Sequence, residues 1–233
     1  MTASPYLLHI TSRPTVVSDT LWKKWYSTEH LPDLVNAKVV TRATLYEEIP
    51  TPMKPNPTEP RKFLAIYQTD RADPIMSKEY GNVSQTSELF TTEGGTNSNG
   101  DNGDFDGRNY ELIDVFDPLK NGQKPSPQLF TVEACPSDDQ DYDAFMSQEH
   151  LPMISKTPGY RRSLRYKLGS VQTPITHGEP FPFMTIHELD DTVKAITSEE
   201  SQKAHATEWT AKRLAEDQFV TRGWKLVCAE GWN

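Results

Sequence analysis

Two histidines stand in the same short motif at two places in the chain. The sequence Glu-His-Leu-Pro at residues 29–32 recurs at residues 149–152. An imidazole titrates near neutral pH and can take a proton from an enolisable substrate or return it. His30 and His150 are therefore candidate acid/base groups. The structural alternative is that the proline ends a helix and the ring bonds the last carbonyl groups of that helix.

The spacing between the two motifs also aligns positions far from them. The aligned pairs are Arg42 and Arg162, Tyr46 and Tyr166, Phe63 and Phe183, Ile66 and Ile186, and Asp70 and Asp190. A register that holds without a gap over this span indicates an internal duplication. The sequence predicts two halves, residues 1–120 and residues 121–233, joined by an exposed linker at 117–125 that contains proline, glycine and lysine.

Each half has hydrophobic patterns that predict the order strand, helix, two strands, helix, strand. The predicted strands are 6–12, 39–47, 62–69 and 110–116, then 128–135, 160–167, 182–189 and 224–229; the predicted helices are 18–30 and 74–90, then one from 137, with a capping box of Ser137 and Gln140, and 198–217. This order is the split βαβ arrangement of a ferredoxin-like fold. Helices cover one face of each sheet, and pairing the two other faces removes an exposed apolar patch. The predicted fold is α+β, a pseudo-dimeric barrel of two ferredoxin-like halves.

The first predicted helix carries a signature that resembles a known group of proteins. Aromatic residues within 21–34 lead into Tyr26-x-x-Glu29-His30-Leu31-Pro32. This pattern resembles the EthD-like branch of the dimeric α+β barrel superfamily, and with both copies counted it covers essentially the whole chain. That superfamily includes isomerases, cyclases, decarboxylases, dehydratases, cofactor-independent oxygenases and haem-binding members. The resemblance implies a small-molecule enzyme, and in fungi it implies a polyketide pathway.

Four further residues are candidates for catalysis because of their places on predicted strands. His9 and Glu133 lie on the first strands of the two halves, and Tyr67 and His187 lie on the third strands. First and third strands are neighbours in a ferredoxin-like sheet, so we expect His9 beside Tyr67 in one cavity and Glu133 beside His187 in the other. A carboxylate can orient and charge an imidazole, and a tyrosine can donate to a developing enolate. The alternative for each is an ordinary buried polar residue with a local partner.

Other aromatic and polar side chains are candidates for binding the substrate. They are Trp22, Trp25, Tyr26, Tyr166, His205 and Trp209. His205 and Trp209 are four residues apart and share one face of a helix. Plain core packing is the alternative for the aromatic residues of the first helix. We place catalysis mainly in the second half, because the helix 198–217 can close a pocket over His150 and His187.

Composition excludes several classes of partner. The net charge of -9 and the pI near 5.2 give no basic footprint for nucleic acid. No apolar run approaches the roughly 20 residues of a membrane-spanning helix, and the N-terminus does not resemble a secretory signal. We therefore expect a cytoplasmic protein that binds a small molecule, as a monomeric pseudo-dimer or a homodimer. Cys135 and Cys228 are expected to be reduced thiols.

The sequence gives no motif for a metal or a nucleotide cofactor. Residues 102–107 match the start of an EF-hand loop, but Ile113 stands where the bidentate glutamate is required. We interpret 94–107 as a mobile insertion that folding does not require. No P-loop, GxGxxG, HExxH or GxSxG pattern occurs. The predicted cofactor and metal content is therefore none.

The leading functional hypothesis is a cofactor-independent enzyme of proton-transfer chemistry: isomerisation, cyclisation, dehydration or decarboxylation of an aromatic or polyketide-like molecule. The alternatives are a cofactor-free oxygenase of similar substrates and a non-catalytic barrel that binds small molecules. Haem binding is a lesser alternative, with His150, His187 or His205 as the proximal ligand.

Overall fold

The strands form one closed antiparallel barrel. The computed structural model describes residues 3–53, 60–120, 122 and 124–232. Within these residues the strand order is β1-β3-β2-β8-β5-β7-β6-β4. The strands are β1 (Tyr6–Pro14), β2 (Arg42–Ile49), β3 (Phe63–Thr69), β4 (Gly103–Phe116), β5 (Gln128–Cys135), β6 (Tyr160–Leu168), β7 (Phe183–Leu189) and β8 (Gln218–Glu230). The predicted α+β class is confirmed.

Each half of the chain contributes four neighbouring strands in ferredoxin-like order. The first half gives β4-β1-β3-β2 and the second gives β8-β5-β7-β6. The two sheets join edge to edge at both sides, through β2 with β8 and β4 with β6. Closure leaves no open sheet edge and turns alternate residues toward a common interior. The predicted pseudo-dimeric barrel is therefore confirmed. The division at residue 120 stays a prediction, and residues 121 and 123 of the linker lie outside the described residues.

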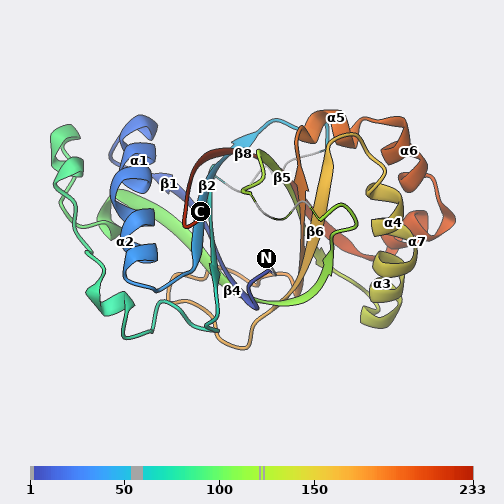
Figure 1. Ribbon diagram of the computed structural model, residues 1–233, viewed down its shortest axis with the longest axis horizontal. Coiled ribbons are helices and arrows are strands. Elements are labelled where there is room, and N and C mark those ends of the chain that lie inside the picture. Colours follow the sequence, from blue (N-terminus) through green and yellow to red (C-terminus); the bar gives the residue numbers. More distant parts are fainter. Residues whose placement is uncertain (1–2, 54–59, 121, 123, 233) are drawn as a thin grey trace.

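Helices cover the barrel on two opposite sides (Figure 1). The helical segments are α1 (Asp19–Trp25), η1 (Tyr26–His30), α2 (Leu31–Asn36), η2 (Tyr80–Asn82), η3 (Glu88–Glu93), η4 (Gly100–Asn102), α3 (Asp139–Phe145), η5 (Met146–His150), α4 (Leu151–Ile154), α5 (Thr192–Ile196), α6 (Glu199–His205) and α7 (Glu208–Glu216). In Figure 1, α1 and α2 lie on one side of the barrel and α3 to α7 on the other. Apolar side chains therefore form separate cores inside the barrel and under each helical layer.

The Glu-His-Leu-Pro motif does not end a helix, in contrast to the prediction. Residues 26–30 form a π-helical turn, in which the Leu31 N–H donates to the Tyr26 carbonyl, and α2 continues beyond it. Pro32 stands in the first turn of α2, where its missing N–H breaks no bond of that helix. The second copy repeats the arrangement, with the Leu151 N–H bonded to the Met146 carbonyl. The histidines therefore sit within continuous helical backbone and do not cap a helix end.

The helix predicted at 198–217 is divided in two. Thr207 separates α6 from α7: its Oγ1 accepts from the Thr210 N–H at 3.1 Å and donates to Glu149 Oε1 at 2.6 Å. A threonine that bonds the next turn and a distant carboxylate competes with the helical ladder. The predicted capping box also differs, because Asp138 caps α3 while Ser137 bonds Asp217.

The segment 94–107 is a packed element and not a mobile insertion. Asn102 is fully buried, and its Nδ2 donates to the carbonyl oxygens of Thr96 and Ser98. Residues from Gly103 onward belong to β4 and pair with β1. The acidic side chain that resembled an EF-hand ligand, Asp104, instead pairs with arginines on the barrel surface. The prediction of a mobile insertion is therefore wrong, because composition does not reveal the pairing with β1 or with the arginines. That folding does not require the segment stays a prediction.

Replacing Asn102 by alanine should lower the free energy of unfolding by about 2 kcal/mol, since the fully buried amide makes two hydrogen bonds that alanine cannot make. Urea denaturation measures this difference. The exposed Asn97 gives the matched control, and Asn97→Ala should change stability by less than about 0.5 kcal/mol. Equal stability of both variants and the unaltered protein would show that the segment is not held in this way.

Candidate functional site

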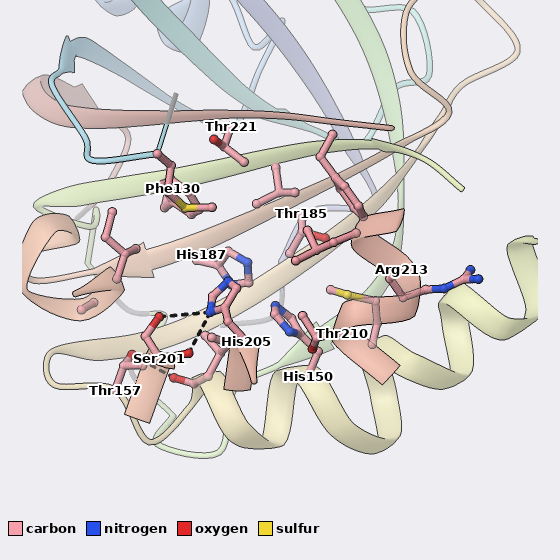
Figure 2. A pocket seen from close by; sticks show the side chains of 18 of the residues that line it. Phe130, His150, Thr157, Thr185, His187, Ser201, His205, Thr210, Arg213 and Thr221 are labelled. Carbon is pink, nitrogen blue, oxygen red and sulfur yellow. Dashed lines mark hydrogen bonds between the residues drawn. The ribbon is translucent and has the colours of Figure 1, made fainter. Parts of the chain in front are cut away.

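A pocket lies between the outer face of the second-half sheet and helices α3 to α7 (Figure 2). Its volume is about 110 Å³, and its lining is largely apolar, with Phe130 and Leu189 on the strand side and Phe145 on α3. It reaches the surface beside Leu214, which is 56% exposed. The short helices α5, α6 and α7 form the outer wall of the pocket. The site is therefore an apolar pocket with a small number of polar groups, the usual composition of a small-molecule site.

Three imidazoles project into this pocket from three different elements (Figure 2). His150 ends the π turn η5, His187 lies on β7 and His205 ends α6. The ring centroid of His150 is 6.3 Å from that of His187 and 6.1 Å from that of His205. π-helical turns are frequent at functional sites. The structure thus brings together three of the residues predicted from the sequence.

His187 is held from behind by a chain of hydrogen bonds. Its Nδ1 lies 2.8 Å from Ser163 Oγ, which lies 2.9 Å from the Tyr160 hydroxyl. That hydroxyl is 3.2 Å from the carbonyl oxygen of Phe116. Burial, and then the charge of His205, lowers the pKa of His187 to about 4. The ring is therefore neutral at physiological pH and fixed in orientation.

The other two imidazoles differ in their partners. His205 Nδ1 lies 2.7 Å from the backbone carbonyl of Ser201. His150 Nδ1 is buried and has no hydrogen-bond partner in the described chain. Burial, and then the charges of His187 and His205, lowers the pKa of His150 to about 3. His150 is therefore a second neutral imidazole, free to respond to a molecule in the pocket.

The corresponding space in the first half is filled by aromatic side chains. Trp22 stacks among Trp25, Tyr26 and Phe90 with centroid distances of 5.0, 5.7 and 5.8 Å, and the residual cavity near His30 measures about 30 Å³. His30 itself stacks on Trp25 at 4.5 Å, and burial lowers its pKa to about 4. This half has a packed core where the second half has a pocket.

Several predicted substrate-binding residues therefore lie elsewhere. Trp22, Trp25 and Tyr26 are core residues and do not line the 110 Å³ pocket. Trp209 packs edge-on against Phe145 at 5.7 Å, outside the pocket lining. Tyr166 points into the barrel interior, on the opposite side of the sheet. His205 is the predicted substrate-binding residue that the pocket contains.

The predicted pairs His9–Tyr67 and Glu133–His187 are wrong, because each pair is split between the two faces of the sheet. Tyr67 is directly opposite Leu8 in the β1–β3 ladder, and His187 is directly opposite Phe130 in the β5–β7 ladder. Residues directly opposite share a face, so the odd-numbered neighbours on β1 and β5 point the other way. Tyr67 and His187 face helices, whereas His9 and Glu133 face the barrel interior.

The barrel interior holds a second, highly polar cavity of about 200 Å³. His9 and Glu133 line it together with Asp106, Arg108 and Arg222. The Arg108 guanidinium is paired with both Glu133 and Asp106. Burial, and then the positive charges of the two arginines, lowers the pKa of His9 to about 3. Glu133 is therefore engaged in an ion-pair network and is not an orienting partner for His187.

Two residues that the sequence analysis missed, Tyr160 and Ser163, hold His187. A signal for both was present in the duplication, since their first-half equivalents are Val40 and Ala43. Tyr67 likewise stands at the position that corresponds to His187. Positions at which a polar group replaces an apolar one in only one copy indicated a specialised half.

The pocket does not fit a haem, and the described residues show no metal centre. No group of three or more His, Cys, Asp or Glu side chains among the described residues is arranged to hold a metal ion. Pockets for drug-sized ligands usually measure roughly 300–1,000 Å³, and a haem is a large macrocycle. A volume of about 110 Å³ lacks that space, although His150, His187 and His205 are ligands of the right type.

In the described part of the chain, no helix is both long and apolar enough to cross a membrane.

Comparisons with known proteins support the fold more strongly than any activity. No family model matches the chain. Core atranone cluster (CAC) protein 1 of Stachybotrys chlorohalonatus (strain IBT 40285) is 25% identical over 181 residues, which cover 72% of this chain and 70% of that protein. An anthrone oxidase-like protein of known structure gives a TM-score of 0.52 at 12% identity and covers 97% of this chain and 93% of its own.

A haem-bound variant of DypB from Rhodococcus jostii RHA1 gives a TM-score of 0.56 at 8% identity, covering 97% of this chain and 94% of its own. At such identities, similarity between structures shows the fold alone. The resemblance to the EthD-like branch is not confirmed by these comparisons. The chain has the fold of a dimeric α+β barrel, built here from the two halves of a single polypeptide.

Proposed function

We propose that this protein is a small-molecule enzyme of secondary metabolism that transfers a proton on an apolar, ring-containing substrate in the second-half pocket. The observation that carries the proposal is His187, a neutral imidazole held by Ser163 and aimed into an apolar cavity. A neutral imidazole can accept a proton, and its ring lies in a site with a largely apolar lining. No cofactor is required for this step.

The size of the pocket limits the part of the substrate that it holds. An apolar cavity of about 150 Å³ takes a benzene ring in other proteins. A volume of about 110 Å³ therefore suits a single ring, with the remainder of a larger molecule extending past the exposed Leu214. A ring with an enolisable C–H or a phenolic O–H places its acidic proton next to the imidazoles.

The low pKa of His187 is compatible with this role because burial is its main cause. Burial disfavours the isolated imidazolium ion, whereas a neighbouring anion favours it. Removal of a proton from the substrate creates that anion next to the ring, so the ion pair offsets the penalty of burial. The protonated His187 can then return the proton at a different substrate atom, and the ring N–H of the neighbouring His150 can donate a hydrogen bond to the substrate anion. Isomerisation, cyclisation and dehydration all contain such a step.

The name of the relative supports secondary metabolism as the setting. The Stachybotrys chlorohalonatus protein is described as a core member of the atranone cluster. We extend this setting, and no particular reaction, to the present chain.

A cofactor-free oxygenase is the second candidate function. The same base would form a substrate carbanion in an apolar pocket, and an electron-rich carbanion can reduce molecular oxygen. The structural similarity to an anthrone oxidase-like protein favours including this reaction. A barrel that binds a ligand without converting it is the third possibility.

Anthrone, whose methylene group is acidic, is a suitable probe to separate these functions. The unaltered protein is incubated with anthrone in D₂O without oxygen, and deuterium incorporation is followed by NMR. Exchange above the buffer rate supports proton transfer. Consumption of one O₂ with formation of anthraquinone and water in air supports the oxygenase. Binding without either reaction would contradict an enzymatic function for this probe and favour the third possibility.

A further inference from the structure

The chain of hydrogen bonds behind His187 has a preferred direction. The Phe116 carbonyl can only accept, so the Tyr160 hydroxyl donates to it. The Ser163 hydroxyl then donates to the Tyr160 oxygen, and Ser163 Oγ accepts from the Nδ1–H of His187. This direction makes all three bonds. The reverse direction, in which Ser163 donates to His187, makes two and leaves the Phe116 carbonyl without the tyrosine donor.

The direction fixes the tautomer of His187. With its proton on Nδ1, neutral His187 has an unprotonated Nε2. The Nδ1 of His205 also carries a proton, because it lies 2.7 Å from a backbone carbonyl that can only accept. His187 therefore presents a lone pair on the ring nitrogen that is not engaged by the protein.

Other polar groups of the pocket supply few donors. The hydroxyl groups of Thr157 and Thr210 donate to the Ile154 and Ala204 carbonyls, each at 2.8 Å. The Arg213 guanidinium points away from the three histidines (Figure 2) and is paired with acidic residues of the outer helices. Thr185 and Thr221 can act in either sense, and His150 retains one ring N–H. The Nε2 of His187 is thus a fixed acceptor that faces the pocket.

We infer that the pocket selects molecules that donate a hydrogen bond, such as a phenol or an enol, over the matching ethers and carboxylates. A ring O–H directed at Nε2 of His187 satisfies a buried acceptor, whereas an ether leaves it unsatisfied. A carboxylate would meet the lone pair of His187 and would lose its hydration in a largely apolar site. This inference deepens the proposed function, and it rests on that function for the assumption that the substrate occupies this pocket.

Ser163 and Tyr160 are positioning residues in this scheme. When His187 accepts the substrate proton at Nε2, its Nδ1–H continues to donate to Ser163, so the imidazolium retains both bonds. The first half has no such relay, because Val40 and Ala43 occupy the equivalent positions and Tyr67 replaces the histidine. The relay therefore belongs to the half that contains the pocket.

The first test is the ¹⁵N NMR spectrum of the whole protein at pH 7, with His187 assigned by substitution. We expect the population of the Nδ1–H tautomer to exceed that of the Nε2–H tautomer at least roughly tenfold. One additional hydrogen bond of about 1.4 kcal/mol gives this ratio. Ser163→Ala should reduce this ratio, because Nδ1–H of His187 loses its acceptor. Tyr160→Phe should reduce it too, because the Ser163 hydroxyl no longer donates to Tyr160 and can donate to His187 instead. Ser201→Ala is the matched control and should leave His187 unchanged, since the contact of the Ser201 hydroxyl is to His205. A predominant Nε2–H tautomer in the unaltered protein would overturn the inference.

The second test compares phenol, anisole and benzoate as probes in NMR titrations of the whole protein. Phenol should bind at least roughly tenfold more tightly than anisole or benzoate, because one buried hydrogen bond contributes a factor of about ten in affinity. The preference should shrink in Ser163→Ala. Equal binding of phenol and anisole, or binding of none of the three, would overturn the inference. If the tautomer and the preference hold but anthrone undergoes no exchange or oxidation, the proposed function fails and the selectivity stands.

Discussion

Replacement of His187 by alanine should lower the rate of proton exchange on the anthrone probe by about hundredfold or more, the usual contribution of a positioned general base. The imidazole lies at the end of a three-bond relay and projects into an apolar cavity, so its removal leaves the substrate proton without this acceptor. His150→Ala should reduce the rate as well, because His150 is the neighbouring neutral imidazole. The measurement is kcat for deuterium incorporation, with circular dichroism to verify the fold.

The duplication supplies the matched control for this experiment. His30 occupies the same place in the first-half motif but is stacked on Trp25 beside a cavity of only about 30 Å³. His30→Ala should therefore alter stability and leave kcat within about twofold. Full activity of the His187 and His150 variants would contradict the assignment; loss in the His30 variant would then move the site to the first half, and loss in a His9 variant would move it to the barrel interior.

The duplication made the architecture predictable from the sequence. The constant spacing between the two copies aligned Phe63 with Phe183 and Asp70 with Asp190, so one βαββαβ unit implied the other. Each unit alone leaves one sheet face apolar, which required that the sheets meet. The structure confirms this expectation and adds that the sheets meet at both edges, through β2 with β8 and β4 with β6.

The duplication did not show which face of each sheet meets the helices. Alternation along a strand separates two faces but does not say which face meets the helices. In a barrel both faces are buried, so His9 and Tyr67 have equally buried surroundings on opposite sides. The ladder register, a tertiary property, places His187 with the helices and Glu133 with the arginines of the barrel interior.

Local rules failed where a distant group supplied a partner. Proline predicted the end of a helix, yet the π turn places Pro32 where no N–H is needed. The polar composition of 94–107 predicted mobility, yet the residues from Gly103 onward pair with β1, and Asp104 pairs with Arg13 and Arg61. Thr207 divides the helix 198–217 because it also bonds Glu149, 58 residues away in the sequence. A prediction that uses only neighbouring residues in the sequence cannot identify such partners.

The free energy of unfolding should fall steeply as the pH is lowered below 6.5. The buried rings of His9 and His187 have pKa values of about 3 and about 4, whereas the ordinary value is 6.5. Between those values the unfolded chain binds protons that the folded protein does not, so acid favours unfolding. Each ring contributes about 1.4 kcal/mol per pH unit in this window, or about 2 kcal/mol at pH 5. His30 and His150, whose pKa values are also lowered, act in the same direction.

Urea denaturation at pH 7, 6 and 5 measures this effect, and the slope against pH is the informative quantity. Glu133 and Glu188, whose pKa values are raised by burial, act in the opposite direction, because the folded protein then binds their protons more readily. Both glutamates are present in every variant, so a difference in slope isolates the histidine. His9→Leu should reduce the loss of stability between pH 7 and pH 5 by about 2 kcal/mol whatever its effect at pH 7. The exposed His177 is the control, and its replacement by alanine should leave the slope unchanged. An unaltered slope in His9→Leu would contradict the lowered pKa of His9, because it would mean that the ring binds its proton equally well in the folded and the unfolded chain. A larger loss of stability in the variant would mean that the folded barrel holds His9 protonated beside a carboxylate of the interior cavity.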